Sequence, residues 1–192
     1  MKKIKFTAAV LILLMFCTLL SGCGENISIS KKLCNPNANE EAQKVYDYLL
    51  SVYGEKTLSG ITSTNKEEYV VYKYTDGKRP AIMCLDMIHQ VPKDAWHDSE
   101  IDEAIEWHVE CNGIVELVWH WFAPTESTSK GGSFYTEDTD FMPSKALMEG
   151  TQENKWLNRD IETCAIQLQR LQEEGVPVLW RPFHEASGGW FW

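Results

Sequence analysis

The sequence predicts an α/β fold, a (β/α)8 barrel of which about the first four βα units are present. Short apolar runs alternate with amphipathic segments, a pattern typical of parallel strands with helices outside the sheet. Four strands fit into about 130 residues, whereas a complete barrel of this kind takes about 250. No glycine-rich phosphate-binding loop follows any of these strands, which disfavours a nucleotide-binding doubly wound sheet.

The elements are expected to alternate from residue 39 onwards. The expected strands are TLSGIT (57–62), RPAIMCLDMI (79–88), GIVELVWHW (113–121) and VPVLWRPFHE (176–185). The expected helices cover residues 40–53, 66–77, 99–113 and 154–174, with Asn39 and Ser99 as N-caps. Residues 69–72 also suit a strand, and the apolar run at 79–88 predicts a strand buried on both faces. A long polar insert occupies residues 123–152.

The N-terminal segment has the layout of an export signal. A basic start precedes an apolar run that is short for a transmembrane span. The stretch LSGC (20–23) resembles a bacterial lipobox, in which the cysteine becomes the lipidated first residue of the mature protein. We therefore expect a signal peptide at 1–22, a tether at 23–38 and the barrel domain at 39–192. Lipidated Cys23 would hold the protein on the bacterial cell surface, and without the lipid the protein would be secreted.

Composition and charge narrow the classes of function. Hydrophobic residues make up 44% of the chain and charged residues 24%, as in an ordinary globular protein. Without the three lysines of the export signal, the 18 basic residues fall to 15 against 28 acidic ones, and the net charge moves from -10 to -13. Such a surface repels phosphate backbones, so nucleic-acid binding is not expected.

Cysteine spacing gives no metal or redox motif. The cysteines of the mature chain, apart from Cys23, are Cys34, Cys84, Cys111 and Cys164. No pair has CxxC spacing, which argues against a zinc ribbon or a redox centre. Cys84 and Cys164 lie in apolar segments, where a buried thiol is the usual state. Export permits a disulfide, but the sequence does not select its partners.

Polar and aromatic side chains gather at the predicted strand ends. Barrel enzymes carry their catalytic residues at the carboxyl ends of the strands. In this sequence those positions hold Asp86, Trp119, His120, Trp121, Arg181, His184, Glu185 and Trp190. Indole faces stack on sugar rings, imidazole and guanidinium groups bind hydroxyls, and a carboxyl group protonates a glycosidic oxygen. The pattern indicates a sugar-binding cleft with Glu185 as proton donor.

The same residues also have purely structural interpretations. Glu185 is explained equally as an ion-pair partner of Arg181, and His120 as a core histidine with satisfied hydrogen bonds. Asp86 is explained as a group that orients Arg181. A metal site is not expected, because the sequence has no HExxH or HxH spacing. In addition, adjacent residues of a regular strand, as His184 and Glu185 would be, point to opposite faces.

The closing segment WRPFHEASGGWFW (180–192) resembles the strand-four signature of glycoside hydrolase family 26, the β-mannanases and their relatives. Further matching segments are TLSGIT, RPAIMCLD, VELVWHWFAP and GGSFYTEDTDF. The resemblance covers residues 40–192. An isolated His-Glu pair is common, whereas RPFHE followed by GGWFW is specific.

The resemblance implies a retaining endo-β-1,4-mannanase that acts on mannan-type plant polysaccharides. By position, Glu185 matches the acid/base residue, and Arg181 matches an arginine that orients a carboxylate. The residues matching sugar contacts are His120, His184 and Trp190, and we expect Trp121 to join them. In this family the nucleophile follows the seventh strand, so we expect the 192 residues by themselves to be inactive.

Two alternatives stay open. One is a family member that acts on mixed-linkage β-glucan or β-1,3-xylan. The other is a lipid-anchored protein that captures sugars without catalysis. In each case we expect no cofactor and, for a complete chain, a monomer.

Overall fold

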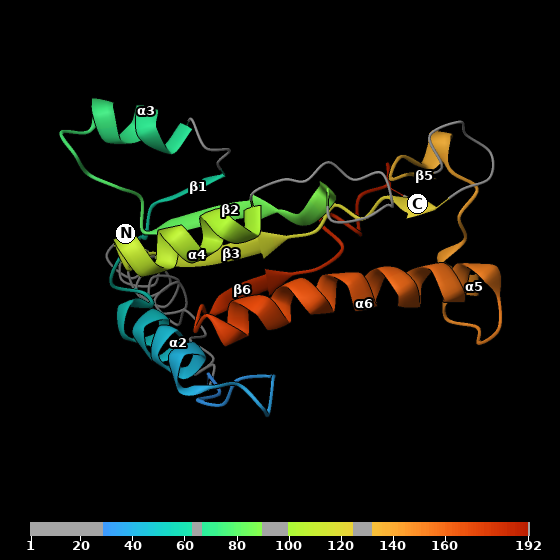
Figure 1. Ribbon diagram of the computed structural model, residues 1–192, viewed down its shortest axis with the longest axis horizontal. Coiled ribbons are helices and arrows are strands. Elements are labelled where there is room, and N and C mark those ends of the chain that lie inside the picture. The colour runs from blue at the N-terminus through green and yellow to red at the C-terminus, as the bar shows by residue number, and fades with distance from the viewer. Residues whose placement is uncertain (1–28, 63–66, 90–99, 125–131, 192) are drawn as a thin grey trace, which may run out of the picture. The chain divides into compact units, whose positions relative to one another are not determined.

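The computed structural model describes residues 29–62, 67–89, 100–124 and 132–191 (Figure 1). The chain divides into two compact units, residues 1–36 and 37–192, and every helix and strand discussed below belongs to the second. Within the described residues, no helix is both long enough and apolar enough to cross a membrane. The expected signal peptide and Cys23 lie outside the described residues.

A four-stranded parallel sheet forms the centre of the second unit. Its strands are β1 (Gly60–Thr62), β2 (Ile82–Asp86), β3 (Ile114–Val118) and β6 (Val178–Arg181). They stand in the order β1-β2-β3-β6, and every neighbouring pair is parallel (Figure 1). The four predicted strands are confirmed in type and order, and each is shorter than its apolar run.

The main helices fall where the apolar periodicity predicts them. They are α2 (Glu40–Val52), α3 (Glu67–Tyr74), α4 (Glu100–Cys111) and α6 (Gln152–Glu173). Asn39 caps α2 as expected, since its Oδ1 accepts the N–H of Ala42 at 3.0 Å. Residues 69–72 are helical. Helix α6 starts two residues earlier than expected, because the Thr151 hydroxyl accepts the N–H of Asn154 and caps the helix there.

The segment between β3 and α6 contributes to the core. Its first half contains the antiparallel pair β4 (Ala123–Pro124) and β5 (Gly132–Ser133), and the short helix α5 (Pro143–Ala146) precedes α6. Ala123, Phe141 and Ala146 are buried in the main core cluster. The prediction of a polar insert is therefore incomplete, because its scattered apolar residues pack inward.

The sheet has two faces of opposite character. Successive side chains of a strand point to opposite faces, and the strand register aligns them in rows. One face carries the rows Met83, Val115, Val178 and Leu85, Leu117, Trp180. The other face carries the rows Thr62, Cys84, Glu116, Leu179 and Asp86, Val118, Arg181. We call the first the apolar face and the second the polar face.

Helices α4 and α6 enclose the apolar face. Helix α4 packs on β2 and β3, and α6 packs on α4. One core cluster joins these helices to Leu85 and Leu117 of the sheet. Strand β2 alternates between buried and half-buried positions. The prediction that this strand is buried on both faces is wrong, because Cys84 and Asp86 lie on the polar face.

The turn between α4 and β3 shows why a glycine occupies it. Trp107 of α4 is buried against this turn, and a Cβ on Gly113 would come within 2.0 Å of the Trp107 Nε1. Any larger residue would push the indole out of its position. His108 Nδ1 lies 3.0 Å from the Gly113 carbonyl oxygen and so ties the helix end to the same turn.

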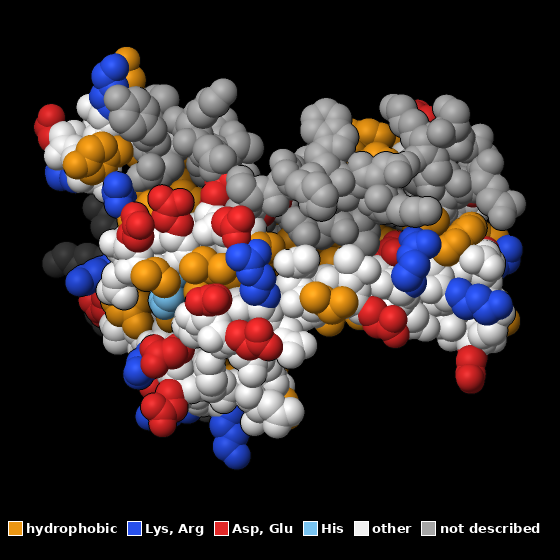
Figure 2. Space-filling model, viewed as in Figure 1, with side chains coloured by type: hydrophobic (Ala, Val, Ile, Leu, Met, Phe, Trp, Pro, Cys, Tyr) orange, Lys and Arg blue, Asp and Glu red, His pale blue; other side chains and the backbone are white. Residues whose placement is uncertain are grey.

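The acidic surplus of the sequence appears on the outer surface. Helix α4 carries five acidic residues, three of them in its first turn, where negative charge interacts favourably with the helix dipole. Figure 2 shows acidic side chains gathered over the part of the molecule where α4 lies.

Candidate active site

The polar face of the sheet borders a cavity of about 440 Å³. All four strands contribute to its wall, and so do the segments that follow β3 and β6. Its polar lining consists of Thr62, Cys84, Asp86, Glu116, His120, Arg181 and His184. Ligands of α/β folds bind at the carboxyl ends of the strands, where Asp86 and Arg181 stand.

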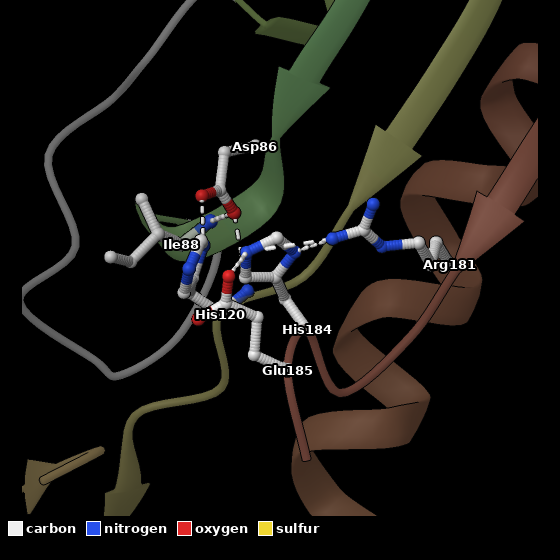
Figure 3. Close-up of polar contacts among 6 residues, drawn as sticks. All are labelled: Asp86, Ile88, His120, Arg181, His184 and Glu185. Carbon is white, nitrogen blue, oxygen red and sulfur yellow. Dashed lines mark hydrogen bonds and ion pairs between the residues drawn. The ribbon is translucent and has the colours of Figure 1, made fainter. Parts of the chain in front are cut away.

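Asp86 holds the imidazole of His120. Its Oδ1 accepts the backbone N–H groups of Ile88 at 3.1 Å and His120 at 3.2 Å, and its Oδ2 contacts His120 Nδ1 (Figure 3). The side chains of Asp86 and His120 are 25% and 24% exposed. His120 is therefore not an enclosed core histidine. The interpretation that Asp86 orients Arg181 is wrong, because both of its oxygens serve the segment around His120.

Arg181 connects strand β3 to the turn after β6. Its Nη1 lies 3.6 Å from Oε1 of Glu116, which stands on β3. Its Nη2 contacts Nδ1 of His184 (Figure 3). The carboxylate of Glu185 contacts His184, with 3.4 Å between its Oε1 and Nε2. The interpretation of Glu185 as an ion-pair partner of Arg181 is therefore wrong. Arg181 pairs with Glu116, and Glu185 pairs with His184.

The backbone turns sharply after β6 and places two site residues side by side. Phe183 and Glu185 adopt left-handed φ values of 51° and 55°, which are costly for residues other than glycine and often occur at functional sites. The N–H of His184 donates to the Trp119 carbonyl at 2.9 Å and secures the turn against the end of β3. The expectation that His184 and Glu185 point to opposite faces is wrong, because the strand ends at Arg181.

The surroundings of His184 disfavour its charged form. Burial lowers the pKa of its imidazole, and the neighbouring His120 and Arg181 lower it further. The rings of His120 and His184 lie close, with their centroids 3.9 Å apart. Two adjacent cationic rings would repel each other, so the neighbouring ring favours an uncharged His184 that acts as a hydrogen-bonding group.

Glu185 and Trp190 lie on the exposed part of the same closing segment. Their side chains are 47% and 54% exposed. A Cβ on Gly188 would come within 2.6 Å of the Trp190 ring, so a glycine there lets the indole lie against the backbone. The N–H of Thr136 donates to the Trp190 carbonyl at 2.9 Å and joins this segment to the insert. The predicted proton donor and the predicted sugar platform therefore both lie exposed on one short segment, and neither lines the cavity itself.

Trp121 lies in the core. Its side chain is 2% exposed, and its Nε1 donates to Oδ2 of Asp160 in α6 at 2.9 Å. Its ring packs edge-on against Phe141, with centroids 4.8 Å apart. The expectation that Trp121 binds substrate is contradicted, because neither ring face is open to a ligand. Side chains continue to alternate between the two faces after the end of β3. Because His120 faces the cavity, its neighbours Trp119 and Trp121 point toward the core.

Two residues of structural importance escaped the sequence reasoning. Glu116 is a lone charge within an apolar strand, a pattern that signals a polar group facing a cavity. Asp160 lies one helical turn before Cys164, on the apolar side of α6, and is fully buried. Its Oδ1 accepts a hydrogen bond from the Arg159 Nε at 2.7 Å. An acidic residue at an apolar position of the helical period would have revealed it.

The described cysteines carry free thiols. Cys164 is buried as expected, whereas Cys84 is half-buried beside the cavity. Burial raises the pKa of the Cys84 thiol, and Glu116 raises it further, so this thiol stays protonated. Among the residues that the structure describes, no group of three or more His, Cys, Asp or Glu side chains is arranged to hold a metal ion.

The fold and the site define the class of the protein. A parallel sheet with outer helices places imidazoles, a guanidinium group, a carboxyl group and an exposed indole near its carboxyl ends, as in (β/α)8 barrels that act on sugars. The family model for glycosyl hydrolase family 26 matches residues 34–192. The chain belongs to this family, and the resemblance found in the sequence is confirmed.

Curated relatives extend the comparison. The chain is 41% identical over 173 residues to a mannan endo-1,4-beta-mannosidase of Thermothelomyces thermophilus, covering 85% of this chain and 35% of that protein. It is 30% identical over 178 residues to a mannan endo-1,4-beta-mannosidase of Bacillus subtilis, covering 82% of this chain and 46% of that protein. The chain thus spans between a third and a half of the length of these relatives.

Solved structures confirm the predicted barrel fold. The GH26-CBM35 beta-(1,4)-mannanase of Podospora anserina matches with a TM-score of 0.76 and 39% identity, covering 85% of this chain and 38% of that one. The beta-mannanase from a symbiotic protist of the termite Reticulitermes speratus, complexed with gluco-manno-oligosaccharide, matches with a TM-score of 0.75 and 33% identity. That match covers 85% of this chain and 55% of the protist chain.

Proposed function

We propose that the protein is a retaining endo-β-1,4-mannanase that hydrolyses mannan-type polysaccharides, with Glu185 as its acid/base residue. The observation that carries this proposal is the contact of Glu185 with His184 beside His120, at the carboxyl end of a family 26 sheet. The matched proteins from Thermothelomyces thermophilus and Bacillus subtilis are both mannan endo-1,4-beta-mannosidases, which supports mannan as the substrate class.

The proposed chemistry starts with proton transfer from Glu185. Its half-exposed carboxyl group protonates the glycosidic oxygen, and the leaving sugar departs. The resulting carboxylate lies 3.4 Å from His184 Nε2, which stabilises its charge. As the leaving sugar departs, a second carboxylate bonds to the anomeric carbon and forms a glycosyl-enzyme. Glu185 then acts as a base and takes a proton from the water that displaces this carboxylate, which releases the sugar and restores both carboxyl groups. A retaining reaction needs a second carboxyl group about 5–5.5 Å from the first, and we propose that a later strand of the complete barrel supplies it.

The other site residues receive binding roles in this proposal. The exposed indole of Trp190 provides a face on which a sugar ring stacks. The imidazole of His120 binds a hydroxyl group of the sugar beside the scissile bond, and His184 lies against it with ring centroids 3.9 Å apart. Arg181 fixes the position of His184 through its contact with Nδ1.

The test uses the protein with its complete barrel and the variant Glu185→Gln, assayed on β-mannan, mixed-linkage β-glucan and β-1,3-xylan. General acid catalysis contributes about 10²- to 10⁴-fold, so we expect a loss of that size in kcat/KM on mannan. The matched control is Glu106→Gln, which changes an exposed glutamate of α4. It should leave the rate unchanged.

Each other outcome selects an alternative. Hydrolysis of glucan or xylan but not mannan assigns the protein to a different specificity within the family. Binding of mannan without hydrolysis by the unaltered protein makes it a sugar-capture protein. Full activity in Glu185→Gln removes the acid/base role from this residue.

We also propose that the protein is anchored to the bacterial cell surface by lipid on Cys23. The LSGC stretch after an apolar signal segment supports this. Cells fed a labelled fatty acid should incorporate the label into the protein, and Cys23→Ser should abolish the incorporation. Labelling that persists in Cys23→Ser would contradict the proposal.

A further inference from the structure

The two adjacent imidazoles of the site have chemically different neighbours. His120 Nδ1 meets Oδ2 of Asp86, whereas His184 Nδ1 meets Nη2 of Arg181 (Figure 3). The charged groups around both rings are Asp86 from β2, Arg181 from β6 and Glu185 from the following turn. These neighbours determine which ring nitrogen of each histidine carries the proton.

An ionised carboxylate only accepts hydrogen bonds. Since Asp86 Oδ2 contacts His120 Nδ1, that nitrogen must donate and therefore carries the proton. The Asp86 carboxylate is itself fixed, because its Oδ1 accepts two backbone N–H groups. Neutral His120 is thus the Nδ1–H tautomer, and its Nε2 presents a lone pair.

A guanidinium group only donates hydrogen bonds. Since Arg181 Nη2 contacts His184 Nδ1, that nitrogen must accept and carries no proton. Neutral His184 is therefore the Nε2–H tautomer. Its Nε2 lies 3.4 Å from Oε1 of Glu185, the proposed acid/base residue, and 3.5 Å from Arg181 Nη2, which lies closer to Nδ1. Burial, the neighbouring His120 and the cation of Arg181 lower the pKa of His184 and favour the neutral ring.

We propose that Asp86 and Arg181 are positioning residues that hold His120 and His184 in opposite neutral tautomers. His120 Nε2 then accepts a hydrogen bond from a sugar hydroxyl group. His184 Nε2–H supports the carboxylate of Glu185. With ring centroids 3.9 Å apart, the pair places an acceptor for the sugar on His120 beside a donor for Glu185 on His184. The role of the sugar hydroxyl rests on the proposed function, whereas the tautomers follow from the protein contacts alone.

The tautomers are measured directly by long-range ¹H–¹⁵N correlation NMR of the full-length protein labelled with ¹⁵N-histidine, at pH 7.5. We expect one Nδ1–H ring and one Nε2–H ring, identified by the loss of their signals in His120→Gln and His184→Gln. Finding both rings in the same neutral tautomer, or either ring protonated on both nitrogens, would overturn the proposal. This measurement needs no variant that alters the positioning residues.

The variant Asp86→Asn then tests the cause. The amide of asparagine donates to His120 Nδ1, so we expect His120 to shift toward the Nε2–H tautomer while His184 keeps its own. The matched control is Asp102→Asn, which removes the carboxylate that pairs with Arg170 on the surface at 2.5 Å. It should leave both rings unchanged. An unchanged His120 tautomer in folded Asp86→Asn would contradict the positioning role.

Kinetics separate this inference from the proposed function. If the protein hydrolyses mannan, Asp86→Asn should lower kcat/KM by about 2- to 10-fold, the effect of one lost hydrogen bond between neutral groups. Arg181→Lys, which keeps a donor, should retain more activity than Arg181→Met. If the unaltered protein hydrolyses no mannan, the proposed function fails and the NMR result still decides the tautomers. A rate in Asp86→Asn equal to that of the unaltered protein would remove the role of His120 as an acceptor for the substrate.

Discussion

The two faces of the central sheet are built from alternate residues of the same four strands, yet they do different things. On the apolar face, Leu85, Val115 and Leu117 are almost completely buried beneath α4 and α6. On the polar face, Glu116 and Arg181 form an ion pair at the edge of a cavity. Burial of apolar area is the main source of folding free energy, whereas half-exposed ion pairs contribute little. The apolar face therefore stabilises the fold, and the polar face provides the groups for chemistry.

Adjacent residues of β3 give the largest expected contrast between the faces. Leu117→Ala removes a fully buried side chain and should lower the free energy of unfolding by about 2–5 kcal/mol. Glu116→Gln keeps the shape but loses the ion pair with Arg181, and should change the free energy by at most about 1 kcal/mol. Urea titrations of both variants beside the unaltered protein provide the measurement.

The order should be reversed for catalytic activity. As long as both variants remain folded, Glu116→Gln should lose more activity than Leu117→Ala. Glu116→Gln frees one end of Arg181, which contacts His184, and should slow hydrolysis without unfolding the protein. Equal losses of stability in the two variants would show that the faces are not divided in this way.

A smaller effect is expected when the pH is lowered. The pKa of His184 is lowered in the folded protein, so between that pKa and about 6.5, the value for free histidine, the unfolded chain binds a proton that the folded chain does not. The free energy of unfolding contributed by this residue is therefore fully present above pH 6.5 and declines as the pH falls. Urea titrations at pH 8 and pH 5 should show a larger decline in the unaltered protein than in His184→Gln. Identical declines in the unaltered protein and in His184→Gln would show that His184 is not the source of this pH dependence.

The rates at which the cysteine thiols react should also distinguish the polar face from the core, and this test requires no substitution. Burial raises the pKa of Cys164 to about 12, with Asp160 adding to the effect, and only the thiolate reacts. At pH 8 an aromatic disulfide reagent should modify exposed Cys34 first, Cys84 on the polar face slowly, and Cys164 only after unfolding. Mass spectrometry identifies the modified residues. Rapid modification of Cys164 in the folded protein would place it outside the enclosed core.

The order of strands and helices was predictable because it depends on short-range patterns. Apolar runs of strand length and helical stripes closed by caps such as Asn39 are properties of a few neighbouring residues. The grouping of His120 with His184 was also predictable, because parallel strands bring their carboxyl ends to one edge. The closing segment identified the family for the same reason: its residues are contiguous.

The contacts within the site were not predictable in the same way. One interpretation paired Asp86 with Arg181, but Asp86 holds His120, 34 residues away along the chain. Trp121 was expected in the cleft but donates to Asp160, 39 residues away. Sequence spacing places residues on a face or at a strand end, but it does not state which of several neighbours a side chain will reach.

The sequence by itself determined the α/β alternation, the family and the set of residues at the strand ends, because each of these is encoded locally. The tertiary structure decided the end of β6 at Arg181, the left-handed turn that joins His184 to Glu185, and the burial of Trp121. These features depend on how strand ends, helix and insert pack together, and packing balances many long-range contacts at once. The same packing sets the neighbours of each imidazole, and with them the chemistry of the site.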